Sequence, residues 1–205
     1  MDLKKIKIIA VFGIFGICFL AHFIYTWFPN TLFSIFFPVN ESIWEHMKMF
    51  STSVLIYSII DFILLKKNEI FYHNFLISLL FQIVLGIIFF LLLYLPIYAF
   101  TGENLPLNII VLFISICFSQ IISYYVLSCK NYDLFNYISL IGIIFIYIIF
   151  GILTYYPPIN NLFYDKMHEK YGINTYNAWY FNKIFIFFQE KWPFLGPNLF
   201  LNANA

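Results

Sequence analysis

Five apolar stretches, each long enough to cross a lipid bilayer, constrain most strongly what this chain can fold into. They cover roughly residues 8–28, 46–65, 74–98, 107–129 and 134–155. An α-helix needs about 20 consecutive apolar residues to cross about 30 Å of hydrocarbon. In hydrocarbon, a helix satisfies its backbone hydrogen bonds within one segment. We therefore expect an all-α fold, a polytopic transmembrane helix bundle with five spans.

The composition argues against a soluble domain. Of the 205 residues, 62% are hydrophobic and 10% are charged, whereas soluble domains are about 45–50% apolar and about 25% charged. A domain of this size has too little interior to bury so much apolar surface. The net charge is only +1, so the chain lacks the basic face that nucleic acid requires. We expect the lipid bilayer as its partner and no nucleic acid. The frequent Ile, Phe, Asn, Tyr and Lys indicate an AT-rich bacterial genome.

Prolines and polar residues divide the chain into two parts. Residues 1–155 are predicted to form the bundle, because Pro157 and Pro158 stop the fifth span. Residues 156–205 are predicted to form a tail on the outer face. Within this tail, residues 174–192 are expected to form an interfacial amphipathic helix, with a sixth span as the alternative. A short apolar segment at 30–38 is expected to lie in the interface or to dip back into it.

The lysines predict the orientation. One set of loops and ends carries Lys4, Lys5, Lys7, Lys66, Lys67 and Lys130, whereas the opposite short loops carry only Lys48. Cytoplasmic loops are enriched in lysine. We therefore expect a multi-pass protein of the cell membrane with a cytoplasmic N-terminus.

The densest polar cluster, Pro38–Lys48 (PVNESIWEHMK), precedes the second span. Asn40 is predicted to cap that helix, with Glu41 in its first turn. At about 100° per residue, Glu41, Glu45 and Lys48 fall on one stripe, so Lys48 should contact one or both carboxylates. His46 projects away from this stripe and need not share a ligand with Glu45. The cluster is either a salt-bridged helix start or a functional site. A functional site is considered because charges at a membrane boundary are costly unless they are used.

Other candidate residues lie in the first span and in the tail. His22 is expected inside the outer leaflet, as a proton carrier, a metal ligand or a helix contact. If Phe163–Gly172 is helical, Asp165, His168 and Glu169 share one face, which is either solvated or folded over the mouth near Glu45.

The remaining polar residues suggest structural roles. Asp61 is expected at the interface near Lys66. The three cysteines are expected to pack as small apolar groups. Helix contacts are predicted for Gln82, Ser115, Ser119, Gln120 and Ser123.

Two segments, Pro38–Lys48 and Tyr156–Ile173 (YPPINNLFYDKMHEKYGI), carry a resemblance. Together they resemble an uncharacterised family of small bacterial integral-membrane proteins with a PVNESxWEH signature. This resemblance implies no activity. It draws attention to Asn40, Glu41, Trp44, Glu45 and His46.

Three functions are compatible with these residues. The leading hypothesis is a membrane-embedded hydrolase or transferase acting on a lipid or lipid-linked substrate at the outer leaflet. In it, Glu41 or Glu45 is the general base, and His46 and His22 are acid–base partners. Asn40, Trp44, Asp165 and His168 would contribute to substrate binding. The cofactor is left open, with a divalent metal at His46, Glu45 and His22 as one candidate. The alternatives are a small transporter or permease subunit with a proton or cation site, and a non-catalytic assembly partner.

Overall fold

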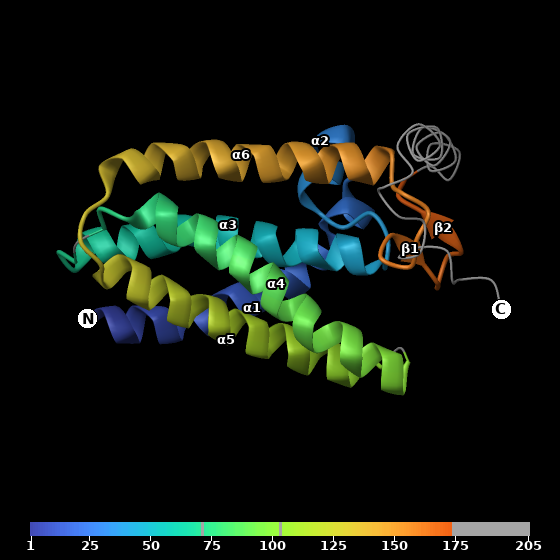
Figure 1. The fold of residues 1–205 in the computed structure, drawn as a ribbon, viewed down its shortest axis with the longest axis horizontal. Helices are drawn as coiled ribbons and strands as arrows, with labels where there is room; N and C mark the ends of the chain where they lie inside the picture. The colour runs from blue at the N-terminus through green and yellow to red at the C-terminus, as the bar shows by residue number, and fades with distance from the viewer. Residues whose placement is uncertain (71, 103, 174–205) are drawn as a thin grey trace, which may run out of the picture. The chain divides into compact units, whose positions relative to one another are not determined.

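In the computed structural model, residues 1–70, 72–102 and 104–173 are described. They form six helices and one short hairpin (Figure 1): α1 (Leu3–Trp27), α2 (Thr31–Phe36), α3 (Ile43–Lys67), α4 (Phe75–Thr101), α5 (Leu105–Ser128), α6 (Asp133–Tyr155), β1 (Tyr164–Asp165) and β2 (Lys170–Tyr171). Five of these helices, α1, α3, α4, α5 and α6, are long and apolar enough to span a membrane. The predicted all-α bundle with five spans is confirmed. The helix predicted at 174–192 lies outside the described residues.

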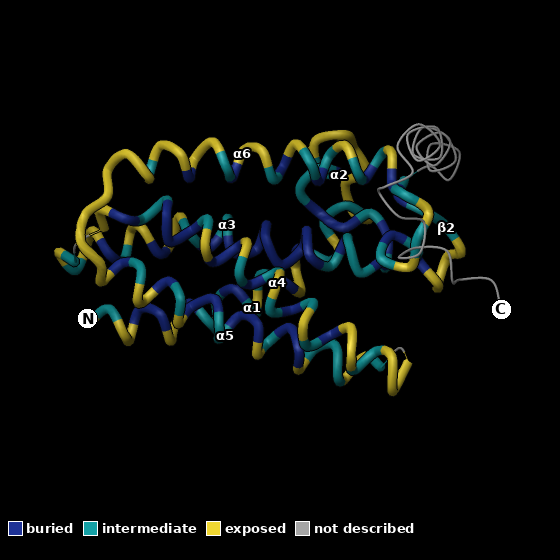
Figure 2. Tube along the Cα trace, viewed as in Figure 1, coloured by how far each residue is buried: buried dark blue, intermediate teal, exposed yellow. Residues whose placement is uncertain are grey.

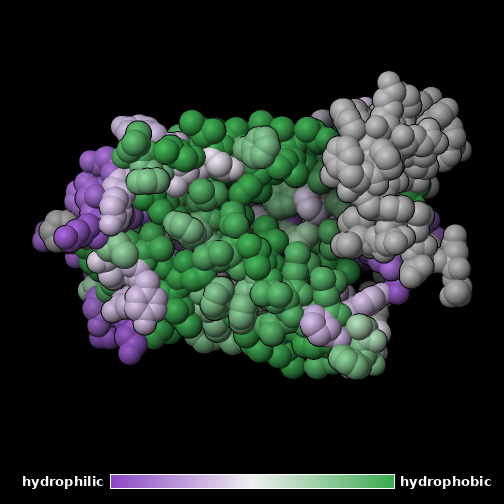
Figure 3. All heavy atoms as spheres, in the orientation of Figure 1, coloured by the Kyte–Doolittle hydropathy of each residue, from purple (hydrophilic) through white to green (hydrophobic). Residues whose placement is uncertain are grey.

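Large apolar side chains cover the outer faces of the long helices, as expected for a bundle surrounded by lipid. Phe12, Ile59, Leu92 and Ile141 are each about two-thirds exposed although each lies well inside a helix. Such contiguous apolar surface is not tolerated in water. Figure 3 shows this green surface over the helices, and Figure 2 shows that exposed and buried positions alternate along them.

The chain forms two compact units, each considered by itself. Unit 1 contains residues 1–22 and 49–146, and unit 2 contains residues 23–48 and the chain from 147 onward. Three long helices, α1, α3 and α6, contribute residues to both units. The division into 1–155 and 156–205 stays a prediction.

Polar side chains join α4 and α5 inside unit 1. The Gln120 amide donates to Gln82 Oε1 at 2.7 Å, and the hydroxyls of Ser78 and Ser123 lie 2.8 Å apart. All four residues are buried. Because interhelical hydrogen bonds hold helices together where lipid gives no hydrophobic drive, these contacts explain why α4 and α5 lie side by side (Figure 1). The predicted role of Gln82, Gln120 and Ser123 is confirmed.

One end of unit 1 gathers the lysines. The N-terminal ammonium of Met1 donates to Asn68 Oδ1 at 2.6 Å, and the Asn74 amide donates to the Lys130 carbonyl at 2.8 Å. Below them, Ile6, Leu65 and Leu127 pack into one cluster. The start of α1, the α3–α4 loop and the α5–α6 loop therefore meet at this end, which is hydrophilic in Figure 3. We call it the lysine end.

Asp61 faces the inside of the bundle. Its carboxylate is buried and forms an ion pair with Lys7 from α1, whereas the sequence suggested only its nearness to Lys66, and its depth at the interface stays a prediction. Hydropathy places a residue along its own helix but not around it, and only the packing of α1 against α3 shows that both charges face inward. Buried charges need such a partner.

Unit 2 is built around short elements. Asn30 caps α2 by accepting the Phe33 N–H at 3.0 Å. The ring of Phe36 packs on Tyr147 of α6, with 4.9 Å between centroids. Beyond α6, β1 and β2 pair as an antiparallel hairpin, with Asp165 opposite Lys170.

Candidate functional site

The first turn of α3 positions the polar cluster. The helix begins at Ile43, and Ser42 occupies the capping position, since its carbonyl accepts the His46 N–H and its hydroxyl accepts the Glu45 N–H at 3.4 Å. The prediction that Asn40 is the cap, with Glu41 in the first turn, was wrong. The sequence Ser42-x-x-Glu45 is the capping-box pattern that would have located this start.

Asn40 instead ties the loop before α3 to the end of the hairpin. Its side-chain oxygen accepts the Ser42 N–H at 2.9 Å, and its amide donates to the Gly172 carbonyl at 3.1 Å. The residue is buried. The 163–172 segment therefore folds over the mouth of α3, as one of the two sequence-based alternatives proposed.

A fully buried ion pair lies beneath this loop. Lys48 Nζ is 2.5 Å from Glu45 Oε2, and both side chains are at most 1% exposed. The predicted contact between Lys48 and Glu45 is confirmed. Glu45 also accepts the Val39 N–H at 3.1 Å.

The other donors of Lys48 are also used. They reach the Ser34 carbonyl at 2.7 Å and the Thr154 hydroxyl at 2.8 Å, while that hydroxyl donates to Glu45 Oε1 at 3.1 Å. An ammonium has three donors, so every one is matched. This network joins α2, α3 and α6. Both Glu45 oxygens take part in hydrogen bonds within it, so their role is structural.

The 163–172 segment is a hairpin rather than a helix. The turn between β1 and β2 is set by Asp165, whose Oδ1 accepts the N–H groups of Met167 and His168 at 2.9 and 3.1 Å. Glu169 has φ 51° and Gly172 has φ 51°, in the left-handed region. Such local bonding by an Asp side chain competes with helix formation. The helical face predicted for Asp165, His168 and Glu169 was therefore wrong.

The hairpin still brings Asp165 and His168 together. Asp165 is fully buried, and its Oδ2 lies 2.8 Å from His168 Nδ1. Burial alone would raise the pKa of Asp165, but hydrogen bonds from the Glu41 N–H and from His168 lower it below its usual value. The carboxylate is thus ionised at neutral pH and accepts a hydrogen bond from the Nδ1–H of His168. This tautomer puts the lone pair of His168 on Nε2, in a side chain that is 52% exposed.

His46 is held in the same tautomer. Its Nδ1 lies 2.9 Å from the Ser42 carbonyl, which can only accept, so Nδ1 carries the proton. The lone pair is then on Nε2, which lies 3.7 Å from Glu41 Oε2. Both side chains are about one-third exposed. These two atoms could together coordinate one divalent cation, and the Ser42 carbonyl would orient the ring.

Trp44 forms one wall of this region. Its ring packs on Phe150 and Phe163, with centroids 5.2 and 4.8 Å away. Its indole N–H is buried and has no hydrogen-bond partner among the described residues. An indole N–H normally finds a partner when buried. This N–H group could therefore donate a hydrogen bond to a bound molecule.

His22 is the last residue of unit 1, so its part in this site stays a prediction from the sequence. Sequence reasoning missed Ser34 and Thr154, the two partners that complete the Lys48 network. A lone serine and a lone threonine in apolar helices carry no signal, because such residues usually bond within their own helix.

The family model described as Family of unknown function (DUF6512) matches residues 1–173. No curated protein and no solved structure matches the chain.

Proposed function

The chain belongs to DUF6512, a family of unknown function, and from its own side chains we propose a membrane-embedded hydrolase or transferase that acts on a lipid or lipid-linked substrate. One observation carries this proposal. Two histidines, His46 and His168, both have Nδ1 fixed by an acceptor, so both present a basic Nε2. The loop residue Glu41 joins them, because its side chain faces His46 and its N–H bonds to Asp165.

This arrangement suits acid–base chemistry at an ester or phosphoester. One imidazole Nε2 would take the proton from a water or an acceptor hydroxyl as its oxygen bonds to the carbonyl carbon or phosphorus. The other, protonated, would give its proton to the oxygen that leaves. We assign the role of base to His168, since the buried Asp165 carboxylate orients its ring and would stabilise the imidazolium. For His46, the acceptor that orients the ring is the Ser42 carbonyl, and Glu41 lies on the Nε2 side, where it would stabilise an imidazolium. The oxygens of Glu45 are already used.

The position of these residues favours a lipid substrate. His46 and Glu41 lie at the start of a membrane-spanning helix, where the bilayer meets water. We propose that this face is the outer one, because the lysine end of unit 1 should be cytoplasmic in the cell membrane. A substrate that stays in the bilayer could present its headgroup linkage to Nε2 of either histidine.

Lipid turnover tests the proposal. Purified full-length protein in nanodiscs made from bacterial lipid extract is incubated at neutral pH, and the lipids are compared by mass spectrometry. We expect new lyso-lipids, freed headgroups or transferred headgroups with the wild-type chain. Either His168→Ala or His46→Ala should lower product by about 100-fold or more. Glu69→Gln, at an exposed position of unit 1 that lines neither site, is the control and should leave the yield unchanged.

Metal analysis of the same samples distinguishes a metal-dependent reaction from one that uses the two histidines alone. Zinc or manganese that co-purifies with the wild type and is lost in both Glu41→Gln and His46→Ala would assign a metal role to that pair. His22→Ala tests the sequence-based hypothesis of a third ligand from α1. If no lipid changes in any sample while the folded protein is intact, the enzyme proposal fails and the transporter and assembly alternatives take its place.

A further inference from the structure

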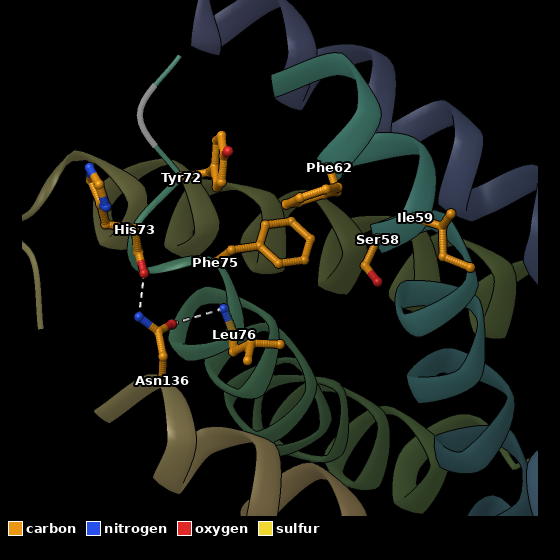
Figure 4. Close-up of a pocket in the computed structure, with 8 residues that line it drawn as sticks. All are labelled: Ser58, Ile59, Phe62, Tyr72, His73, Phe75, Leu76 and Asn136. Atoms are coloured by element: carbon orange, nitrogen blue, oxygen red, sulfur yellow. Dashed lines mark hydrogen bonds between the residues drawn. The ribbon is translucent and has the colours of Figure 1, made fainter. Parts of the chain in front are cut away.

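A hollow opens on the side of unit 1 next to the lysine end. Its volume is about 470 Å³, within the range of ligand-binding pockets, about 300–1,000 Å³. It is lined by residues from α3, the α3–α4 loop, α4 and α6: Ser58, Ile59, Phe62, Tyr72, His73, Phe75, Leu76 and Asn136 (Figure 4). Most of these side chains are apolar, and the site described in unit 2 uses none of them.

The walls of the hollow are held by specific contacts. The Phe62 ring packs on Tyr72 and Phe75, with centroids 5.1 and 5.3 Å away. Asn136 from α6 accepts the Leu76 N–H at 3.2 Å and donates to the His73 carbonyl, as the dashed lines in Figure 4 show. Asn136 thus caps α4 from another helix and fixes the loop. The hollow is therefore preformed, which lowers the entropy cost of binding.

Three lysines lie close along the chain or in space to residues that line the hollow. Lys66 follows Phe62 by one helical turn, and Lys67 is next in sequence. Lys130 is placed near His73, because Asn74 donates to the Lys130 carbonyl at 2.8 Å. All three lysines are exposed. An apolar hollow with lysines at the membrane–water boundary matches a molecule with a hydrocarbon tail and an anionic head.

We propose that this hollow binds an anionic phospholipid from the leaflet at the lysine end, with its acyl chain against Phe62 and Phe75 and its phosphate near the three lysines. The apolar lining of the hollow disfavours a small water-soluble anion, which has no hydrocarbon chain to place there. The lysines favour a headgroup with a net negative charge over a zwitterionic one. The bound lipid would fill the space between α3, α4 and α6.

Photo-crosslinking tests this site. Full-length protein in phosphatidylcholine nanodiscs receives a small fraction of phosphatidylglycerol with a diazirine on its acyl chain, and labelled peptides are mapped after illumination. We expect labels on peptides containing Phe62 and Tyr72–Leu76. Unlabelled phosphatidylglycerol should displace them, and an equal addition of phosphatidylcholine should not. Labelling should fall roughly fivefold for each lysine among Lys66, Lys67 and Lys130 changed to Gln.

Two controls separate this site from general lipid contact. The double variant Lys4→Gln/Lys5→Gln removes charge from the same end and should label like the wild type. Ile59→Trp fills the hollow and should abolish the labels, whereas Ile63→Trp, one turn along the same helix and also exposed, should not. Labels spread evenly over lipid-facing residues, or equal displacement by phosphatidylcholine, would overturn the proposal.

Discussion

The buried Asp165 carboxylate accepts the backbone N–H of Glu41 at 3.1 Å, although 124 residues separate the two. The same carboxylate holds His168, and the Glu41 side chain faces His46. One carboxylate in the hairpin therefore holds His168 directly and anchors the backbone of Glu41, the residue that faces His46. The hairpin is thus bonded to the loop that precedes α3.

Removing the Lys48 ammonium should destabilise the protein strongly. Lys48→Met would leave Glu45 buried without its partner, which we expect to cost about 3–5 kcal/mol. The measurement is thermal or denaturant unfolding of purified protein in detergent. Lys67→Met, at an exposed position, is the control and should change stability little.

The double variant Lys48→Met/Glu45→Gln should recover much of the loss, since no charge then remains buried. A double variant no more stable than Lys48→Met alone would contradict the view that the pair acts mainly through charge matching.

Gly172 should resist replacement more than Gly102 does. Both have positive φ, at 51° and 67°, where a Cβ costs roughly 1–2 kcal/mol. A Cβ on Gly172 would also lie 2.3 Å from the Thr154 carbonyl oxygen, whereas one on Gly102 meets nothing within 4 Å. Gly172→Ala should therefore lose more stability than Gly102→Ala, and it should expose the hairpin to protease. Equal losses would mean that the hairpin does not pack on α6.

Acid should release the hairpin. The pKa of Asp165 in the folded chain is below its unfolded value of about 3.9. A group with a lowered folded pKa stabilises the fold above the unfolded pKa, and this contribution is lost as pH falls through the folded value. Hydrogen exchange of residues 162–173 should thus accelerate below about pH 4. In Asp165→Asn the exchange should already be fast at neutral pH, with no further step on acidification; a persistent step would assign it to another group.

The orientation is open to a labelling test. In a chain whose three native cysteines are replaced, Glu103→Cys should react with an impermeant maleimide added to whole cells, and Lys67→Cys should react only after the membrane is opened. The reason is the lysine asymmetry between the two faces. The reverse pattern would move the proposed site to the cytoplasmic side.

The five spans were predictable because the hydropathy and the length of each helix are properties of one continuous segment of the sequence. The Lys48–Glu45 contact was predictable for the same reason, since residues three apart meet on one helix face. The start of α3 was also encoded locally, in Ser42-x-x-Glu45, although Asn40 was predicted as the cap. Local rules thus account for most of the fold.

Long-range partners were not predictable. Nothing near Lys7 indicates Asp61, and nothing near Lys48 indicates Thr154, because these contacts depend on how separate helices pack. The hairpin was missed because Asp165 bonds to the backbone of its own turn, which outweighs a weak helical pattern. The same bonds bury Asp165, which the sequence placed among solvated charges or over the mouth of α3.

The tautomers of His46 and His168 test the account most directly. Nitrogen-15 NMR of histidine-labelled protein in nanodiscs distinguishes a protonated Nδ1 from a protonated Nε2, and His46→Ala and His168→Ala assign the two signals. At a pH where the rings are neutral, we predict that both carry the proton on Nδ1 and leave Nε2 unprotonated. Protonated Nε2 in both rings would contradict the hydrogen bonds to Ser42 and Asp165, and with them the proposed acid–base site.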